Sequence, residues 1–382
     1  MPVLTCSRPI GLKGTSDGNS ATGEILELEV VTACGTRLAS KCPSCSDTYK
    51  GRAQIIIGAG LPEPGELARA VFVTLTAPSF GPVHRFGPCI CTRKHAASEV
   101  GIIGAPLNPA RYDYVAAAAW HDALPALWAV TRRRIRVALG GLPGAELVVI
   151  LRAVEYQKRL AAHLHCIVVV RGVSTPAGTC AELIKAALNL DNENHRAQTR
   201  GGFHWGTEAE MVPLYPERKD GHNSYARVAG YLGKYLTKDA QGETAERVHG
   251  PKWRTPAARH RAATRAAARA LVDAQPKPAT WTREPGTLHP IAAAPNRNRE
   301  AARDRKIAAN GYGGHFLSKS PGWGAPHPER GTFKALKDAA QAESIKKNGA
   351  PPIVYAWEYD AAGTRQARER VLFLATANGP PA

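Results

Sequence analysis

Long apolar runs are absent from this sequence. No stretch of about 18 consecutive apolar residues occurs, and the first residues lack a basic segment followed by an apolar core. A membrane span and a secretion signal are therefore not expected, and we predict a cytoplasmic protein with no membrane partner. A Gly-x-x-x-x-Gly-Lys-[Ser/Thr] loop is also missing, so the chain is expected to lack an ATP-driven helicase of its own.

Acidic residues are too few to balance the basic ones. The 382 residues include 32 Asp and Glu against 50 Lys and Arg, which gives a formal net charge of +18. Such a charge favours a polyanionic partner, either nucleic acid or an anionic membrane. Residues 251–310 concentrate it, with 13 Lys or Arg against 4 Asp or Glu. We therefore expect a basic, DNA-binding or accessory region toward the C-terminus.

A second Cys-x-x-Cys pair is missing, although the chain contains eight cysteines. In a reducing compartment these are not expected to form a disulfide framework. Cys42 and Cys45 lie two residues apart, and with Cys34 they supply three ligands of a tetrahedral zinc site. The fourth ligand is expected from Cys6 or from the cluster that contains Cys89, Cys91 and His95. Reduced cysteines without metal are the alternative.

The order of expected elements indicates an α+β fold. A helix at 112–139 carries Arg132, Arg133 and Arg134 near its end and is expected to be kinked or split at Pro125. Strand, helix, strand, strand, helix is the order of a split β-α-β antiparallel sheet with helices on its face. The remaining elements are strands at 70–77, 146–156 and 163–170, helices at 181–190, 225–238 and 256–274, an insertion loop at 191–222, and C-terminal strands at 352–359 and 370–377.

Three domains are expected from these patterns. Residues 1–60 form a Cys-rich segment, residues 61–245 a catalytic domain, and residues 246–382 the basic C-terminal region.

Two histidines two residues apart mark the candidate catalytic strand. His163 and His165 point to the same face because side chains alternate along a strand. Glu155 lies across the hairpin and could complete a three-ligand site that leaves positions open for a phosphate oxygen. Imidazole and carboxylate ligands with a phosphate substrate fit Mg²⁺ or Mn²⁺, and zinc is the alternative metal. The alternative is that His163 and His165 are ordinary polar residues of a strand and bind no metal.

Two tyrosines share one face of the expected helix at 225–238. Tyr231 and Tyr235 are four residues apart, and Lys234 and Lys238 each follow a tyrosine by three. A phenol has a pKa of about 10, so it needs a cationic neighbour or a metal before it attacks phosphorus. Aromatic core residues on an amphipathic helix are the alternative interpretation.

Taken together, these motifs resemble the HUH rolling-circle replication initiators of actinobacterial plasmids and integrative elements. The first motif is similar to Val71-Phe-Val-Thr-Leu-Thr-Ala-Pro-Ser-Phe80, the second to His163-Leu-His165, and the tyrosine motif to Tyr231-Leu-Gly-Lys-Tyr-Leu-Thr-Lys238. Cys42-Pro-Ser-Cys-Ser-Asp-Thr-Tyr49 and Gly311-Tyr-Gly-Gly-His-Phe-Leu-Ser-Lys-Ser320 resemble segments of the actinobacterial branch.

This resemblance implies an HUH-type, ferredoxin-like sheet and a metal-dependent DNA nickase. The metal would be held by His163, His165 and Glu155, and Tyr231 or Tyr235 would form a 5′-phosphotyrosine and later rejoin the strand. Expected partners are single-stranded origin DNA with its duplex flanks, and a host helicase and polymerase. The DNA contacts are expected from Arg132, Arg133, Arg134, His315 and Lys319, although Gly311–Ser320 could instead be a tight structural turn.

Other functions would explain part of the same sequence pattern. A relaxase or transposase would share the same chemistry and differ in its DNA target. A non-catalytic, zinc-stabilised DNA-binding regulator would use the basic surface and the cysteines, and it would form no covalent adduct. A structural RNA-binding protein would explain the charge but not the repeated tyrosines and lysines.

Overall fold

The structure is a computed structural model of the chain. It describes residues 5–16, 27–216, 224–237, 255–275, 294–325, 327–328, 330–339, 355–360 and 364–366. The chain divides into two compact units, a larger one of Leu61–Val228 and Ala240–Trp323 and a smaller one of Met1–Gly60, Ala229–Asp239 and Gly324–Ala382. The expected division into three functional domains stays a prediction.

A five-stranded antiparallel sheet forms the centre of the larger unit. Its strand order is β8-β3-β7-β6-β9. The strands are β3 (Ala68–Thr76), β6 (Leu147–Tyr156), β7 (Ala162–Arg171), β8 (Ala209–Leu214) and β9 (Leu317–Lys319). Because α2 connects β3 to β6 while β7 lies between them, these strands form a split β-α-β unit. The expected α+β class with an antiparallel sheet is confirmed.

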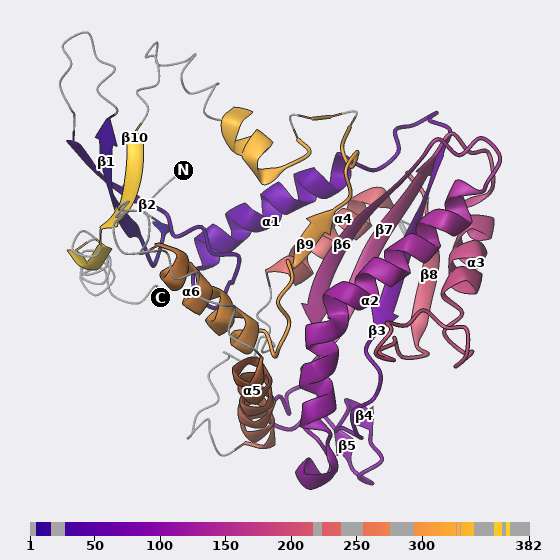
Figure 1. The fold of residues 1–382 in the computed structure, drawn as a ribbon, viewed down its shortest axis with the longest axis horizontal. Helices are drawn as coiled ribbons and strands as arrows, with labels where there is room; N and C mark the ends of the chain where they lie inside the picture. The colour runs from indigo at the N-terminus through magenta and orange to yellow at the C-terminus, as the bar shows by residue number, and fades with distance from the viewer. Residues whose placement is uncertain are drawn as a thin grey trace, which may run out of the picture. The chain divides into compact units, whose positions relative to one another are not determined.

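Two helices cover one face of this sheet (Figure 1). They are α2 (Tyr114–Gly140) and α3 (Ala177–Leu188). Apolar residues of α2 recur at helical spacing, so Leu124, Leu127 and Ile135 are buried together with Leu164 and Val168 of β7. The Asp113 side chain accepts a hydrogen bond from the amide of Ala116 at 2.8 Å and caps the start of α2.

Two local expectations about the larger unit are corrected. Of the two outcomes expected at Pro125, a kink or a split, the split is wrong, because α2 runs as one helix through this residue. The helix bends along its length (Figure 1). Residues 191–222 are not only loop, because β8 lies within them and Trp205 is buried in the core. The strand was not predicted because Pro213 interrupts its sequence pattern. Proline is tolerated here because β8 is an edge strand, where one side of the backbone needs no amide hydrogen for pairing.

The remaining elements of the larger unit are short strands and two basic helices. Helix α5 (Pro256–Ala274) has the expected bounds, and α6 (Ala294–Ala308) follows it. The connection from β3 to α2 contains β4 (Gly87–Pro88), β5 (Lys94–His95) and a 3-10 turn at Pro109–Arg111.

The smaller unit contains a three-stranded antiparallel sheet with the order β10-β1-β2. Its strands are β1 (Ile10–Ser16), β2 (Glu27–Thr32) and β10 (Tyr355–Asp360). It also contains α1 (Pro43–Gly58) and, from Ala229 onward, the helix α4 (Tyr225–Leu236). Lys238 and the strand expected at 370–377 lie outside the described residues. Within the described part of the chain, no helix is long and apolar enough to cross a membrane.

Candidate active site and metal-binding groups

His163 and His165 lie on β7, on the face of the sheet that α2 does not cover. Their neighbours Leu164 and Cys166 point the other way, into the core beneath α2. Glu155 of β6 is the direct cross-strand partner of His163, so its carboxylate emerges on the same face. The hairpin of β6 and β7 therefore brings together the three side chains that the sequence singled out.

Both ring nitrogens of His165 have polar neighbours. Nε2 lies 3.1 Å from Oε2 of Glu155, and Nδ1 lies 3.3 Å from Oγ1 of Thr74 on β3. The ring also stacks on Phe72, with 5.5 Å between centroids. Because His165 is 2% exposed, these contacts fix the orientation of its imidazole.

The imidazole of His163 is held through its Nδ1 atom. This atom lies 3.0 Å from Nε2 of Gln157 and 3.3 Å from Oγ1 of Thr76. Burial, the neighbouring His165 and the guanidinium of Arg159 together lower the pKa of His163 to about 3. His163 is therefore a neutral imidazole at physiological pH, the form that binds metal ions.

This group has the donor chemistry of a divalent-cation site, but its donor atoms are spread. In the described part of the chain, two groups have ligand atoms that all lie within 4.8 Å of one another, and neither includes His163, His165 or Glu155. The ring centroids of the two histidines are 4.7 Å apart. The strand geometry thus places three suitable side chains on one face without closing them around a point.

Tyr231 and Tyr235 form a pair on α4. Their ring centroids lie 4.3 Å apart, and Tyr231 is 39% exposed. Lys234 is exposed beside them, whereas Leu232 and Leu236 are buried on the opposite side of the helix. Tyr231 is therefore not a core residue, and its role as a nucleophile stays a prediction.

Helix α4 is anchored closely within the smaller unit. A Cβ added to Gly233 would lie 2.7 Å from Cγ of Gln54 on α1, so a larger residue here would force the Gln54 side chain to move. At the C-terminal end of α4, a guanidinium nitrogen of Arg37 donates a hydrogen bond to the carbonyl of Leu236 at 2.8 Å. The amide of Ala39 donates to the carbonyl of Thr237 at 3.3 Å. The loop that contains Arg37 therefore caps the C-terminus of the tyrosine helix.

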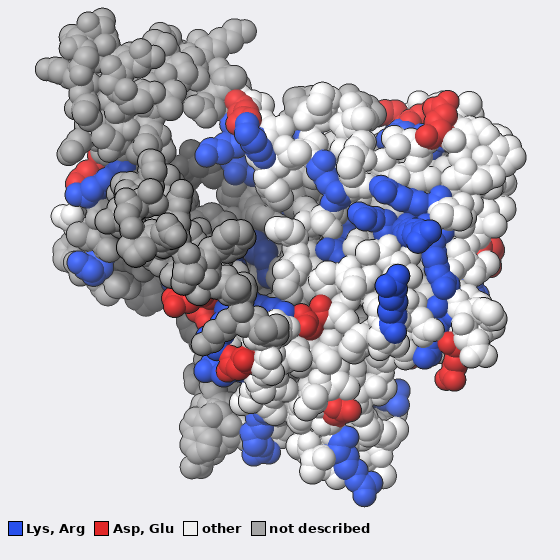
Figure 2. Space-filling view, in the orientation of Figure 1, with Lys and Arg blue, Asp and Glu red and all other residues white. Residues whose placement is uncertain are grey.

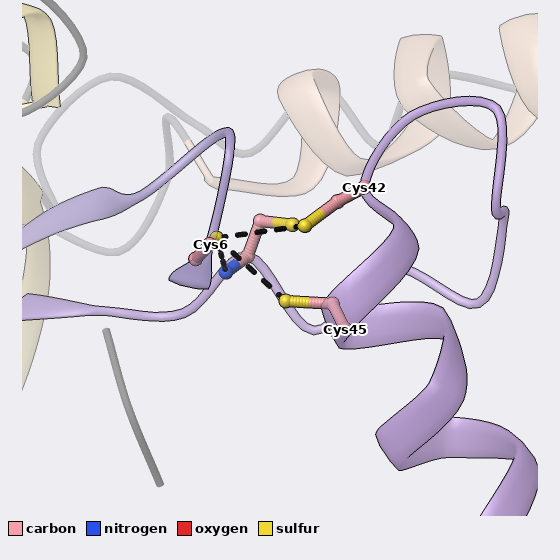
Figure 3. A group of neighbouring side chains, drawn as sticks. Cys6, Cys42 and Cys45 are labelled. Atoms are coloured by element: carbon pink, nitrogen blue, oxygen red, sulfur yellow. Dashed lines mark hydrogen bonds between the residues drawn. The ribbon is translucent and has the colours of Figure 1, made fainter. Parts of the chain in front are cut away.

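Four cysteines converge at the start of α1. Sγ of Cys6 lies 3.9 Å from Sγ of Cys42 and 3.6 Å from Sγ of Cys45, as Figure 3 shows. Cys34 completes the group, and its amide donates to Sγ of Cys6 at 3.3 Å. Tetrahedral zinc thiolates place sulfur atoms about 3.8 Å apart, so this four-cysteine group could hold a structural metal such as zinc. Of the two sources expected for the fourth ligand, the structure places Cys6, and not the cluster of Cys89, Cys91 and His95, beside the other three cysteines.

Cys89, Cys91 and His95 do not join that group. They form a separate one with His84, here called the His84–His95 group. Hydrogen bonds from the backbone of Cys91 and Arg85 lower the pKa of the Cys89 thiol to about 7. A thiol that is readily ionised is a good metal ligand.

The basic side chains of α2 lie in a different layer from the histidine pair. Lys and Arg side chains gather over α2 and α3 on the face shown in Figure 2. Arg134 stabilises the fold, because its guanidinium donates hydrogen bonds to the carbonyls of Ala187 and His195. Arg133 is exposed and Arg132 is half-buried. Their role in DNA binding stays a prediction.

Segment 311–320 has a structural role whether or not it meets DNA. The buried guanidinium of Arg152 donates to Ser318 Oγ, the Tyr312 hydroxyl and the His315 carbonyl. The ammonium of Lys319 donates to the carbonyl of Trp323 at 3.4 Å. The expected phosphate contacts of His315 and Lys319 stay predictions.

Several residues of these sites were missed from the sequence. Thr74 and Thr76 alternate along the first motif, and this spacing of two could have placed them on the histidine face. Gln157 and Arg159 lie in the hairpin turn, where no periodicity identifies a function. His84 was missed because it lies five residues before Cys89 without a recognisable spacing.

Comparisons with known proteins give one consistent result. A family described as "RepSA: Replication initiator protein, pSAM2" matches residues 2–378. A "Replication initiator protein" of Streptomyces ambofaciens is 33% identical over an alignment 278 residues long, and the alignment covers 62% of this chain and 60% of that protein. The chain therefore spans about three fifths of this relative's length. No solved structure matches the chain.

Proposed function

The chain belongs to the RepSA family of replication initiator proteins, and from this premise we propose that it starts replication of a plasmid or integrative element by nicking one DNA strand. In this proposal the sheet of the larger unit is an HUH-type catalytic core, and the DNA is cut and rejoined through a 5′-phosphotyrosine. The strand order β8-β3-β7-β6 has the ferredoxin-like connectivity that this core requires.

The observation that carries the proposal is the histidine face of the β6–β7 hairpin. His163, His165 and Glu155 emerge together, and Thr74, Thr76 and Gln157 orient the two imidazoles. Two imidazoles and a carboxylate are a donor set for Mg²⁺ or Mn²⁺. When bound, the cation would polarise the scissile phosphate. A purely structural strand would have no need of this set of oriented polar side chains.

The tyrosines of α4 supply the nucleophile in this proposal. The phenol oxygen of Tyr231 or Tyr235 forms a bond to phosphorus while the bond from phosphorus to the 3′ oxygen breaks. The phenol proton passes to water, and the leaving oxygen takes up a proton to become a 3′-hydroxyl. Lys234, exposed on the same helix, and Lys238 are proposed to assist this attack. Because the phosphoester bond is conserved in the link, the reverse attack rejoins the strand without ATP.

The test is formation of a covalent protein–DNA adduct. Purified full-length protein is incubated with end-labelled single-stranded DNA that tiles its own replicon, with Mn²⁺, and the products are separated on a denaturing gel. We expect an adduct on one tile that disappears with EDTA and in the Tyr231→Phe, Tyr235→Phe double variant. Binding without an adduct on any tile would reject the nickase.

A DNA-binding regulator is the second candidate, because two cysteine-containing groups suited to a structural metal could stabilise a purely binding protein. It predicts tight origin binding that is unchanged in the tyrosine double variant. A relaxase or transposase would form the same adduct but on a transfer origin or transposon end, so the position of the reactive tile separates it from a replication initiator.

A further inference from the structure

The connection between β3 and α2 is held by few apolar contacts. Of residues 82–108, those that reach the interior are few, among them Ile103 and Ala105, and the segment's regular structure is the two-residue pair β4 and β5. A segment of this kind needs another source of stability, and a metal ion is a common one.

We propose that His84, Cys89, Cys91 and His95 bind a second zinc ion, independent of the four-cysteine group. Four side chains in two pairs, one pair of imidazoles and one of thiols, form a ligand set that structural zinc sites use. The β4–β5 hairpin produces the arrangement, because it places Gly87 opposite His95 and leaves Cys89 and Cys91 in the turn. This proposal does not depend on the nicking reaction.

The distances between ligand atoms match a tetrahedral site. Nδ1 of His84 lies 3.2 Å from Nε2 of His95 and 4.0 Å from Sγ of Cys89, and Sγ of Cys91 lies 3.2 Å from Nε2 of His95. Usual zinc bond lengths give about 3.4 Å between two nitrogens and about 3.6 Å between nitrogen and sulfur. The two imidazole rings are perpendicular, at 90°.

Nε2 of His95 faces two other ligand atoms of the group at once. Nδ1 of His95 lies 3.1 Å from the carboxylate of Glu99, so in the neutral ring this contact favours the proton on Nδ1 and leaves Nε2 as the acceptor. Nε2 then has a single lone pair, yet Sγ of Cys91 and Nδ1 of His84 both lie 3.2 Å from it. One lone pair accepts one hydrogen bond, whereas a cation at the centre would satisfy all of these atoms.

Glu99 has the role of an orienting carboxylate. Its Oε1 accepts a hydrogen bond from the amide of Ala96 at 2.8 Å, and its Oε2 faces His95. Carboxylate, histidine and zinc in series is the usual outer arrangement of such sites. His95 is 1% exposed, so its imidazole is shielded from solvent.

The site would brace the basic helix α5. His84 exchanges backbone hydrogen bonds with Gly104 and Ala105, and the carbonyl of Gly101 accepts the amide of Ala257 at the first turn of α5. A zinc ion bound to His84 would therefore help to fix the backbone segment 101–105, to which the first turn of α5 is hydrogen-bonded.

The test is the zinc content and coordination of the purified full-length protein. We expect two zinc ions per chain, one after Cys89→Ser with Cys91→Ser, and one after Cys42→Ser with Cys45→Ser. Cys180→Ala, which changes a buried cysteine of α3 outside both groups, should keep both ions. Glu99→Gln should weaken one of the two ions about 10- to 100-fold in a chelator competition.

X-ray absorption of the wild-type protein gives a result that does not depend on how the variants fold. Two sites predict on average three sulfur and one nitrogen ligand per zinc, from the ligands of the two groups. One zinc per chain with sulfur-only coordination would overturn the proposal. Full zinc content in the Cys89→Ser, Cys91→Ser protein would overturn it as well.

Discussion

At the scale of single residues, the histidine pair should be needed for chemistry and not for folding. His163→Ala and His165→Ala remove ligands of the proposed cation, whose contribution of several kcal/mol corresponds to a loss of at least about 1,000-fold in adduct formation. The rate of adduct formation and the thermal midpoint are measured together.

His195→Ala is the matched control, because His195 is an exposed histidine of the same unit. It should keep wild-type cleavage. Near-normal cleavage by both His163→Ala and His165→Ala would contradict the assigned role.

His121 should make stability depend on pH. It is 1% exposed and accepts a hydrogen bond from the amide of Ala162 at 2.9 Å. Burial, with a smaller contribution from Arg159, lowers its pKa from 6.5 to about 4. Because the unfolded chain binds a proton first as the pH falls, stability is full above pH 6.5 and is lost between pH 6.5 and 4.

This one group should cost about 2 to 3 kcal/mol at pH 4.5. Urea unfolding at pH 7 and pH 4.5 measures it, and His121→Gln should lose less stability than the wild type over that interval by this amount. Equal losses in the two proteins would show that His121 does not titrate in this way.

At the scale of elements, the loop between Cys34 and Cys42 should control the end of the tyrosine helix. Arg37→Ala removes the hydrogen bond to the carbonyl of Leu236, which is worth about 1.5 to 3 kcal/mol for a charged donor. Amide exchange in the last turn of α4 should become about 10-fold faster. Cys42→Ser should have the same effect if the four-cysteine group holds that loop.

Lys41→Ala is the control for this experiment, since Lys41 is an exposed cation of the same loop. Its exchange should match the wild type. Unchanged exchange at residues 231–237 in Arg37→Ala would show that the loop does not hold the helix.

Elements with strong periodicity were predicted well from the sequence. Helix α5 has a Thr-Pro start and an alanine-rich body, and β6 and β7 are β-branched runs separated by a short turn. The edge strands β8 and β9 were missed because their sequences are polar or interrupted, whereas the edge strand β10 overlaps the strand expected at 352–359. Strand β9 has three residues and exists through its pairing with Leu151–Ala153, a long-range contact that no local pattern encodes.

The candidate site was predictable as far as local spacing defines it. A spacing of two placed His163 and His165 on one face, and a hairpin placed Glu155 opposite them. The metal-binding groups needed tertiary structure, because Cys6 reaches Cys34, Cys42 and Cys45 only after folding, and His84 pairs with His95 across a turn. Ligands that are far apart in sequence carry no common periodicity.

At the scale of the whole molecule, the charge of +18 should make DNA binding strongly dependent on salt. Neutralising 6 to 10 phosphates would lower the affinity by roughly 10³ to 10⁵ between 50 and 200 mM salt. Replacing Arg132 and Arg133 by alanine should reduce the salt slope by about 2 if each contacts a phosphate. Fluorescence anisotropy with labelled origin DNA measures both effects.

Lys13→Ala serves as the control, because the ammonium of Lys13 already pairs with Glu29 at 2.8 Å. Its slope should equal that of the wild type. A slope that is unchanged in the double arginine variant would exclude the α2 surface from the DNA interface.

A tyrosine of α4 should become covalently linked to DNA. Trypsin separates the two candidates, since cleavage after Arg227, Lys234 and Lys238 gives one peptide with Tyr231 and another with Tyr235. Mass spectrometry of the digested adduct should find a nucleotide on one or both of these peptides, attached through a 5′ phosphate. A nucleotide on any other peptide, or a 3′ linkage, would contradict this account.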